Sequence, residues 1–317
     1  MSGIAGQLAT SSANTAYVLA ASEIFSRQNS DAWGAFTYKV PCDGQSLEVD
    51  VAGPSAEVRE LIGSQRFSSF REYARRIPVK PYRTDALELP RQRVELDKSG
   101  TVEQFLRDYL SANAMFWYKP VVDVLLSNPT CLDGVSLLND SHPYASGGGT
   151  WDNKTTSSLD ATTLEAGWVA MSGLKLENGA PAGIRPTHLM VSPKFEREAM
   201  DLLGVNRAIP FSNAGVPDAA ANVVAAVVME NWLKGRLQLI VEPRMYDGTH
   251  DDDWLLMDLS KPSAKPVIAG EAIAPQAVVV TSAESESMIQ RDSFQYYVTG
   301  NAAIGGFVPH VVYGKLS

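Results

Sequence analysis

Four histidines, two cysteines and one acidic run are the residues of this 317-residue sequence that could carry chemistry. The densest group is His250-Asp251-Asp252-Asp253, whose oxygen atoms could bind a hard cation such as Ca²⁺. The run lacks the spacing and the glycine of an EF-hand loop, so a solvated turn before a strand at Trp254 is the better interpretation.

Nucleophilic catalysis finds little support in the residue pattern. Ser141 and His142 are adjacent, but a catalytic serine does not use the next residue as its base, and no GxSxG elbow is present. Cys131 is expected to be a small buried hydrophobe. The sequence also lacks GxxxxGK[ST], GxGxxG after a strand, and HExxH. No catalytic, cofactor or metal site is therefore predicted, and a mixed α/β hydrolase using His142 or the His250–Asp253 run is the weakest alternative.

The composition is that of a globular protein with an uneven charge. The chain is 45% hydrophobic and 20% charged, with a net charge of −9, whereas dedicated nucleic-acid-binding proteins are usually basic. Residues 56–98 contain eight Arg and two Lys against seven Asp and Glu, a balance of +3, which leaves −12 for the rest. This split indicates either a basic element that faces an acidic neighbour, such as another copy of the chain, or a solvated ribbon.

Cysteine usage and hydropathy indicate the compartment. Cys42 and Cys131 are far apart and neither lies in a CxxC motif, which favours a reducing environment. The N-terminal residues lack a basic region and a continuous apolar core, so we expect no signal peptide. No run approaches 18 apolar residues, so we expect no membrane span.

The first third of the chain reads as an arm, a ribbon and a helix. Residues 1–30 are small and polar, with a short helix at 16–25, and predict an arm that becomes ordered only against a partner. Residues 71–94 alternate apolar and basic side chains among three prolines, which predicts an edge hairpin projecting from a core. From Thr101, apolar residues at helical spacing predict one helix of about 25 residues, kinked or restarted at Pro120.

The rest of the chain mixes helices and strands. We expect a helix at 158–174 and another that begins at Ser192 and ends at Gly204. The strand at 254–257 is expected to pair with the one at 237–241 across the acidic turn, and the other expected strands are 187–191, 266–273, 277–281, 294–299 and 308–313. The lack of βαβ alternation and of an internal repeat argues against a doubly wound sheet.

A series of short motifs gives a more specific prediction. The sharpest block is Asp133-Gly134 followed by Leu137-Leu138, Ser141-His142-Pro143 and Asn153. Weaker matches extend over residues 55–315 and comprise Glu60–Gly63 with Gln65-Arg66, Lys80-Pro81-Tyr82, Arg93 with Asp97, Pro186–Pro193, Val241–Pro243, and Trp254-Leu255-Leu256 with Asp258. In order and spacing they resemble the major head subunits of Mu-like tailed phages, the gpT-type capsid proteins. Departures from that pattern at Leu61, Arg83 and Leu138 indicate a distant member.

The resemblance implies an HK97-type capsid fold of class α+β with five segments. These would be an N-terminal arm (1–36), an extended β E-loop (37–97), a P-domain with a long spine helix (98–177), an A-domain (178–270), and strands returning to the P-domain (271–317). The E-loop would lie over a neighbouring subunit, because an isolated ribbon cannot bury its apolar face.

The resemblance also implies a structural protein that assembles with itself. Pentamers and hexamers would form an icosahedral shell that encloses double-stranded DNA without sequence-specific binding, with no cofactor and no membrane. Scaffold, portal, protease and decoration proteins would be further partners, and assembly would take place in the bacterial host cytoplasm. An encapsulin-like compartment shell of the same fold is the main alternative.

Two groups of residues follow from this reading. Subunit-interface residues in the E-loop would be Arg66, Tyr73, Arg75, Arg76, Ile77, Lys80, Tyr82, Arg83 and Leu87. Structural residues of the family motifs would be Asp133, Gly134, His142, Asn153 and Trp254.

Overall fold

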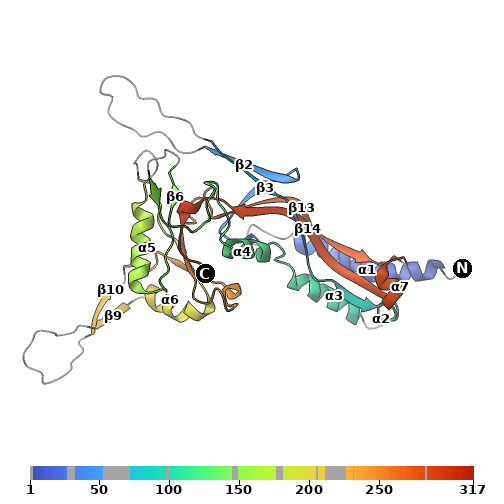
Figure 1. Ribbon diagram of the computed structural model, residues 1–317. Coiled ribbons are helices and arrows are strands. Elements are labelled where there is room, and N and C mark those ends of the chain that lie inside the picture. The colour runs from blue at the N-terminus through green and yellow to red at the C-terminus, as the bar shows by residue number, and fades with distance from the viewer. Residues whose placement is uncertain are drawn as a thin grey trace, which may run out of the picture. The chain divides into compact units, whose positions relative to one another are not determined.

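The chain folds into two compact units built from interleaved segments (Figure 1). The computed structural model describes residues 3–26, 33–52, 72–97, 100–144, 149–175, 181–204, 206–210, 226–230, 232–282 and 284–317. Unit 1 comprises Met1–Val51, Ala74–Leu125 and Val267–Gly305; unit 2 comprises Ala52–Tyr73, Leu126–Pro266 and Gly306–Ser317. These boundaries differ from the five segments expected from the sequence, and that division stays a prediction.

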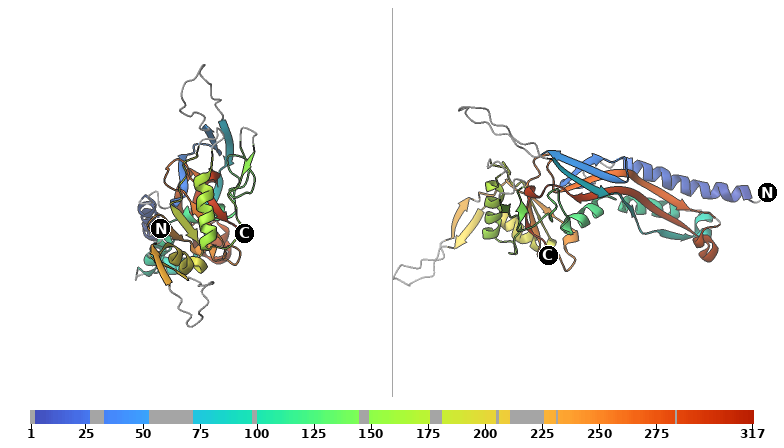
Figure 2. Two further views of the ribbon diagram at one scale, coloured as in Figure 1. Left: turned by 90° about the vertical axis from the view of Figure 1, so that its left-hand side faces the viewer. Right: turned by 45° about the horizontal axis from the view of Figure 1, so that its top comes forward.

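Unit 1 is organised around two long strands that run side by side, β13 (Val267–Val280) and β14 (Ser293–Gly306) (Figure 2). The sheet order is β1-β13-β14-β4, with β1 (Thr37–Pro41) parallel to β13 and β4 (Lys80–Arg83) antiparallel to β14. A further strand, β5 (Leu87–Pro90), also pairs with β14. The two strands predicted at 266–273 and 277–281 are thus one continuous strand.

The N-terminal segment packs within its own unit. Helix α1 (Gly3–Ser26) contacts β13 and α3 (Thr101–Ala112). Tyr17 of α1 is 1% exposed, and its ring meets Tyr296 edge-on at a centroid distance of 5.3 Å. The prediction of an arm that orders only against a partner is therefore wrong for α1, because its small and aromatic side chains find their contacts in the same chain. The short helices α2 (Arg91–Glu95) and α7 (Glu286–Arg291) complete this unit.

The single long helix predicted from Thr101 is two helices, α3 and α4 (Tyr118–Leu126). The break precedes Pro120 and begins at Asn113, whose side-chain nitrogen donates to the Tyr109 carbonyl at 2.8 Å. Trp117 is completely buried, stacked on Trp33 with centroids 4.9 Å apart. A local side-chain bond and the burial of an aromatic ring thus compete successfully with helix continuation. Pro120 then falls in the first turn of α4, where its missing N–H costs nothing.

The predicted ribbon at 71–94 divides into a hairpin and two sheet strands. β2 (Ser46–Ala52) and β3 (Glu72–Pro78) form a two-stranded sheet, whereas β4 and β5 belong to the main sheet. The hairpin buries its apolar side in its own chain, since a Cβ at Gly305 would lie 2.9 Å from Ile77. The prediction of one projecting ribbon is therefore wrong beyond Pro78.

Unit 2 has a four-stranded sheet in the order β11-β8-β12-β15. Its strands are β11 (Gln238–Val241), β8 (His188–Val191), β12 (Trp254–Met257) and β15 (Val312–Lys315). β12 pairs with β8 and β15, so the predicted pairing with 237–241 is wrong; its four residues are all buried, and such a strand takes a central position.

Helices pack on this sheet around one apolar core. α5 (Ala161–Gly173) begins at Asp160, whose side chain forms a capping box with Thr163. α6 (Glu196–Leu203) follows the short helix η2 (Pro193–Phe195), so the predicted start at Ser192 and end at Gly204 agree with the structure. Shorter elements are β6 (His142–Pro143) paired with β7 (Thr150–Trp151), β9 (Asn206–Pro210) paired with β10 (Ala226–Glu230), and the helices η3 (Pro243–Met245) and η4 (Pro309–Val311). Among the described residues, no helix has the length and hydropathy of a membrane span.

Candidate functional site

The Asp133-Gly134 pair forms a tight turn in unit 2. Gly134 has a φ of +82°, a left-handed value that glycine adopts without steric cost. Its amide donates to the Cys131 carbonyl at 3.0 Å, and Asp133 Oδ1 accepts from the Val135 amide at 3.1 Å. The turn thereby leaves the second carboxylate oxygen of Asp133 available for another segment.

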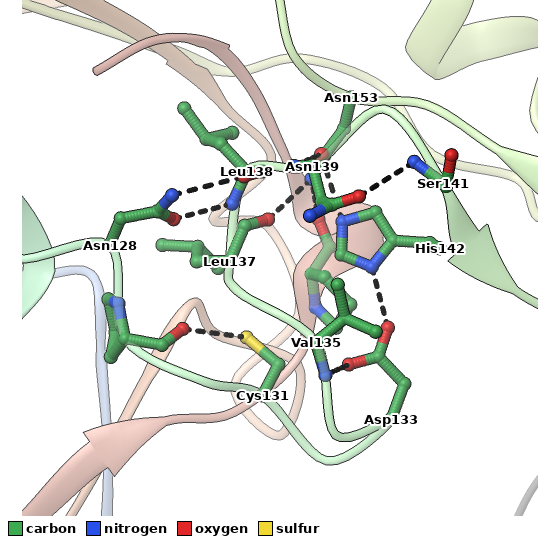
Figure 3. Close-up of polar contacts among 12 residues, drawn as sticks. Asn128, Cys131, Asp133, Val135, Leu137, Leu138, Asn139, Ser141, His142 and Asn153 are labelled. Atoms are coloured by element: carbon green, nitrogen blue, oxygen red, sulfur yellow. Dashed lines mark hydrogen bonds and ion pairs between the residues drawn. The ribbon is translucent and has the colours of Figure 1, made fainter. Parts of the chain in front are cut away.

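His142 lies against that oxygen and forms a buried cluster with Asn153. His142 Nδ1 is 2.6 Å from Asp133 Oδ2, and Nε2 is 3.0 Å from Asn153 Oδ1 (Figure 3). The imidazole has no solvent exposure, and it stacks on Trp151 with centroids 4.4 Å apart. The family-motif residues Asp133, His142 and Asn153 are therefore brought together, and we name them the polar cluster.

Asn153 joins the polar cluster to two other segments. Its Nδ2 donates to the carbonyls of Leu137 at 2.7 Å and Pro309 at 3.0 Å. Its Oδ1 accepts from the Asn139 amide at 2.9 Å as well as from His142. Because both partners of Nδ2 are acceptors, the orientation of the amide is fixed.

The same geometry determines the protons of His142. Asn153 Oδ1 can only accept, so His142 Nε2 carries a hydrogen. Asp133 Oδ2 is a second acceptor, so another proton lies between Nδ1 and the carboxylate. His142 and Asp133 therefore share one proton, and the hydrogen bonds of both side chains are satisfied, the condition under which buried polar groups are tolerated.

Main-chain bonds continue this junction along the C-terminal segment of unit 2. The Gly314 amide donates to the Asn153 carbonyl at 3.1 Å, and the Thr155 amide donates to the Gly314 carbonyl at 2.8 Å. The Leu132 amide also donates to the Phe307 carbonyl at 3.2 Å. The polar cluster therefore holds residues 306–317 against the loop that precedes α5.

The polar cluster lacks the geometry of a catalytic site. Both ring nitrogens of His142 are bonded inside the fold, so neither faces solvent to accept a proton from a substrate. The adjacent Ser141 is bonded through its amide to Asn139 Oδ1 at 2.8 Å, which is a turn contact. A hydrolase using His142 is therefore not supported.

The acidic run forms a structural turn, as the sequence predicted, although Asp253 is fully buried and not solvated. Asp253 Oδ2 is 2.7 Å from His250 Nδ1 and 2.8 Å from the Ser317 amide, and Ser317 Oγ donates to Asp253 Oδ1 at 2.7 Å. His250 and Ser317 both bond to the carboxylate, so this is no relay from serine to histidine. Nowhere in the described ranges do three His, Cys, Asp or Glu side chains gather as a metal site requires.

Trp254, the remaining family-motif residue, is a core residue of β12. Its side chain is completely buried, and Nε1 donates to the Ser157 carbonyl at 3.1 Å. The indole therefore links the loop before α5 to the sheet of unit 2 by a hydrogen bond.

The predicted interface residues do not share one location. Arg66 lies outside the described residues; Tyr73, Arg75, Arg76 and Ile77 lie on β3, Lys80, Tyr82 and Arg83 on β4, and Leu87 on β5. Ile77 is 5% exposed, and the Tyr82 ring meets the Trp117 ring edge-on with centroids 5.8 Å apart, so both side chains pack in the core of unit 1. Arg76, Lys80 and Arg83 have exposed side chains.

Sequence reasoning missed two residues of this site. Asn128 has a φ of +50°, and its side chain bonds the Leu138 amide at 2.7 Å and carbonyl at 3.1 Å. The Asn128-Pro129 pair is a turn signal that could have identified it. The other is Pro309, whose carbonyl bonds Asn153 from 156 residues away, and no local pattern indicates such a contact.

Comparisons with known proteins agree with this description. A family model described as phage capsid protein matches residues 72–309. The procapsid of bacteriophage JBD30 is similar in structure, with a TM-score of 0.51 and 14% identity over 100% of this chain and 76% of that one. A structure from Microbacterium phage Oxtober96 has a TM-score of 0.52 and 13% identity over 91% of both chains. The capsid of a native GTA particle has a TM-score of 0.50 and 12% identity over 91% of this chain and 90% of that one. A comparison with curated protein sequences gave no match.

The fold is that of a shell-forming subunit of the HK97 type, as the sequence predicted. The family match covers most of the chain, and the protein belongs to the phage capsid protein family. It is therefore a phage capsid protein, which is a structural protein and not an enzyme. The match favours this reading over the encapsulin-like and hydrolase alternatives.

Proposed function

We propose that this capsid protein forms the pentamers and hexamers of a closed icosahedral shell that encloses double-stranded DNA without sequence-specific binding. The observation that carries the proposal is the family match over residues 72–309, which includes strands of both units. Head-to-tail contacts between identical subunits close into rings. Repetition of modest contacts over many copies then makes the shell stable.

Within this proposal the chain has the five capsid segments predicted from the sequence. Residues 1–36 form the N-terminal arm, 37–97 the E-loop, 98–177 the P-domain, 178–270 the A-domain and 271–317 the return strands.

We assign the chain to the Mu-like, gpT-type branch of the family. Support comes from the motif block Asp133-Gly134, His142 and Asn153, because one polar cluster accounts for its residue types and spacing. His142 bonds both Asp133 and Asn153, so replacing any one of the three leaves a buried polar group without its partner, and this couples the motif positions.

The contact between neighbouring subunits uses the exposed basic side chains of the β2–β3 hairpin and β4. Arg76, Lys80 and Arg83 carry this role, since Ile77 and Tyr82 are already covered within the chain. The net charge of −9 supplies acidic partners on other copies. A negative net charge also suits a shell that encloses DNA without binding it tightly. Scaffold, portal, protease and decoration proteins are proposed as partners, with assembly in the host cytoplasm.

Charge reversal at the hairpin tests this interface. The double variant Arg76→Glu/Lys80→Glu should leave the subunit folded, because both side chains are exposed, but should abolish closed particles in electron micrographs. Arg107→Glu is the matched control, since Arg107 is exposed and pairs with Glu103 one turn away on the same helix, with Nη2 and Oε1 2.9 Å apart. Closed particles from the double variant in the amount given by the unmodified chain would contradict the assigned interface.

A further inference from the structure

The outer edge of β11 has no backbone partner among the described residues. In the parallel pair of β11 and β8, the Gln238 amide donates to the Thr187 carbonyl at 2.8 Å, and the Glu242 amide donates to the Val191 carbonyl at 2.9 Å. The main-chain groups of residues 239 and 241 therefore point away from β8, since alternate residues of a strand bond to opposite sides. β11 is the last strand of its sheet, so these groups lie on an open edge of unit 2.

Helix α6 packs on the face of β11. The Leu239 and Val241 side chains pack against the apolar core that contains Ala199 and Leu202 of α6. Side chains of a strand stand perpendicular to the sheet, so a helix that contacts them covers the face and leaves the hydrogen-bonding edge. The edge also lacks the residues that usually protect one, because the four residues of β11, Gln-Leu-Ile-Val, include no proline and no charge.

The other three end strands of the two larger sheets are protected. β1 contains Lys39 and Pro41, and β4 contains Pro81. Proline and lysine on an edge strand oppose the addition of a further strand. The edge of β15 is covered within the chain, because Gly314 forms a bridge with Lys154. β11 is therefore the exception among these four end strands.

The β9–β10 ribbon is a segment of the same unit that lacks a further neighbour. β9 and β10 pair with each other in a two-stranded sheet (Figure 1), and neither packs extensively on another described helix or strand. Such a ribbon is marginally stable alone and gains from a third strand. β10 suits that role better than β9, because its sequence Ala-Val-Val-Met-Glu has no proline, whereas β9 ends at Pro210. Its five residues also match the four of β11 in length.

We propose that β10 of one subunit adds to the β11 edge of the next copy, so that the four-stranded sheet of unit 2 continues into the neighbour's β9–β10 ribbon. The inference rests on the proposed function, because it requires identical subunits to assemble. Each chain carries one open edge and one ribbon, so the contact is head-to-tail and repeats from subunit to subunit around a ring. Main-chain hydrogen bonds of Leu239 and Val241 supply the affinity, as in other cases of strand addition.

Hydrogen exchange at single-residue resolution, on the full-length chain as free subunit and as assembled particle, measures this contact. The amides of Leu239 and Val241 should exchange at least about tenfold more slowly in the particle, because each gains a hydrogen-bond acceptor there. The amides of Gln238 and Glu242 are the internal control, since they already donate to β8 in the subunit and should be slow in both states.

A pair of variants in β10 identifies the segment that covers the edge. Val228→Pro removes a main-chain donor from β10, whereas Val228→Thr keeps the donor and the β-branched shape. Particles of Val228→Pro should lose the slow exchange of Leu239 and Val241, and those of Val228→Thr should keep it. Loss of particles in Val228→Pro alone, with unchanged urea unfolding of the subunit, supports the contact equally.

Two results would overturn this contact and leave the proposed shell standing. One is a closed particle of the unmodified chain in which Leu239 and Val241 exchange as fast as in the free subunit. The other is slow exchange that persists in Val228→Pro particles, because another segment then covers the edge. If Val228→Pro fails to fold, the comparison of particle and subunit for the unmodified chain decides. A chain that never assembles refutes the proposed function, and the strand addition with it.

Discussion

Replacing Asn153 by alanine should be among the most damaging single changes in unit 2. The side chain makes four hydrogen bonds, two from Nδ2 to carbonyls and two to Oδ1. It is 2% exposed, so bulk water does not replace these bonds without rearrangement. The variant removes the Asn153 partner from the Leu137 and Pro309 carbonyls, the Asn139 amide and the His142 ring N–H; the Pro309 carbonyl keeps the Val312 amide as a donor.

The magnitude follows from the cost of unpaired buried groups. Each such group costs about 1–3 kcal/mol, and a water molecule entering the cavity would recover part of the loss. We therefore expect Asn153→Ala to lower the free energy of unfolding by about 4 kcal/mol. Asn153→Asp keeps the size but turns a donor toward two carbonyls into an acceptor, and its loss should be at least as large.

Urea unfolding followed by tryptophan fluorescence measures this loss, because Trp151 stacks on His142. Thr156→Ala is the matched control, an exposed polar residue three positions along the same loop, and it should change stability by less than about 0.5 kcal/mol. A loss below about 1 kcal/mol for Asn153→Ala would refute the central role given to its hydrogen bonds.

Two further pairs of variants test packing and burial by thermal unfolding. Gly314→Ala should destabilise by about 3 kcal/mol or more, because its Cβ would lie 2.2 Å from the Trp254 carbonyl oxygen, whereas Gly173→Ala meets nothing within 4 Å and should be close to neutral. Equal effects of the two would show that close approach of β15 to β12 is unimportant. Tyr17→Phe should be neutral or stabilise by about 1 kcal/mol, since the buried Tyr17 hydroxyl has no partner among the described residues. Tyr296→Phe should cost about 1 kcal/mol, because the Tyr296 hydroxyl donates to Asn14 Oδ1 at 3.1 Å. A larger loss of stability for Tyr17→Phe than for Tyr296→Phe would contradict these hydrogen-bond assignments.

Much of the fold could be predicted where local signals are strong. The helix after Ser192 and the strand at 188–191 follow from a capping residue, an early proline and an apolar run. The long helix from Thr101 could not be predicted in one piece, because its break depends on a tryptophan that stacks on Trp33, far away in sequence. The division of the predicted ribbon also depends on contacts far away in sequence, because β4 and β5 pair with β14.

The candidate site was predictable in its residue types but not in its connections. The motif block identified Asp133, His142 and Asn153, and the structure adds the proton arrangement that makes them one unit. The contact with Pro309 was not predictable from local pattern, because nothing near that residue indicates a partner 156 positions away.

Electron cryomicroscopy of the purified full-length chain, alone and co-expressed with scaffold and protease proteins of a related phage, tests the central claim most directly. The account predicts closed icosahedral particles in which pentamers and hexamers repeat a subunit with the sheet order of units 1 and 2. Dimers or tetramers under both conditions, with no larger species, would contradict the assignment of this chain as a shell subunit.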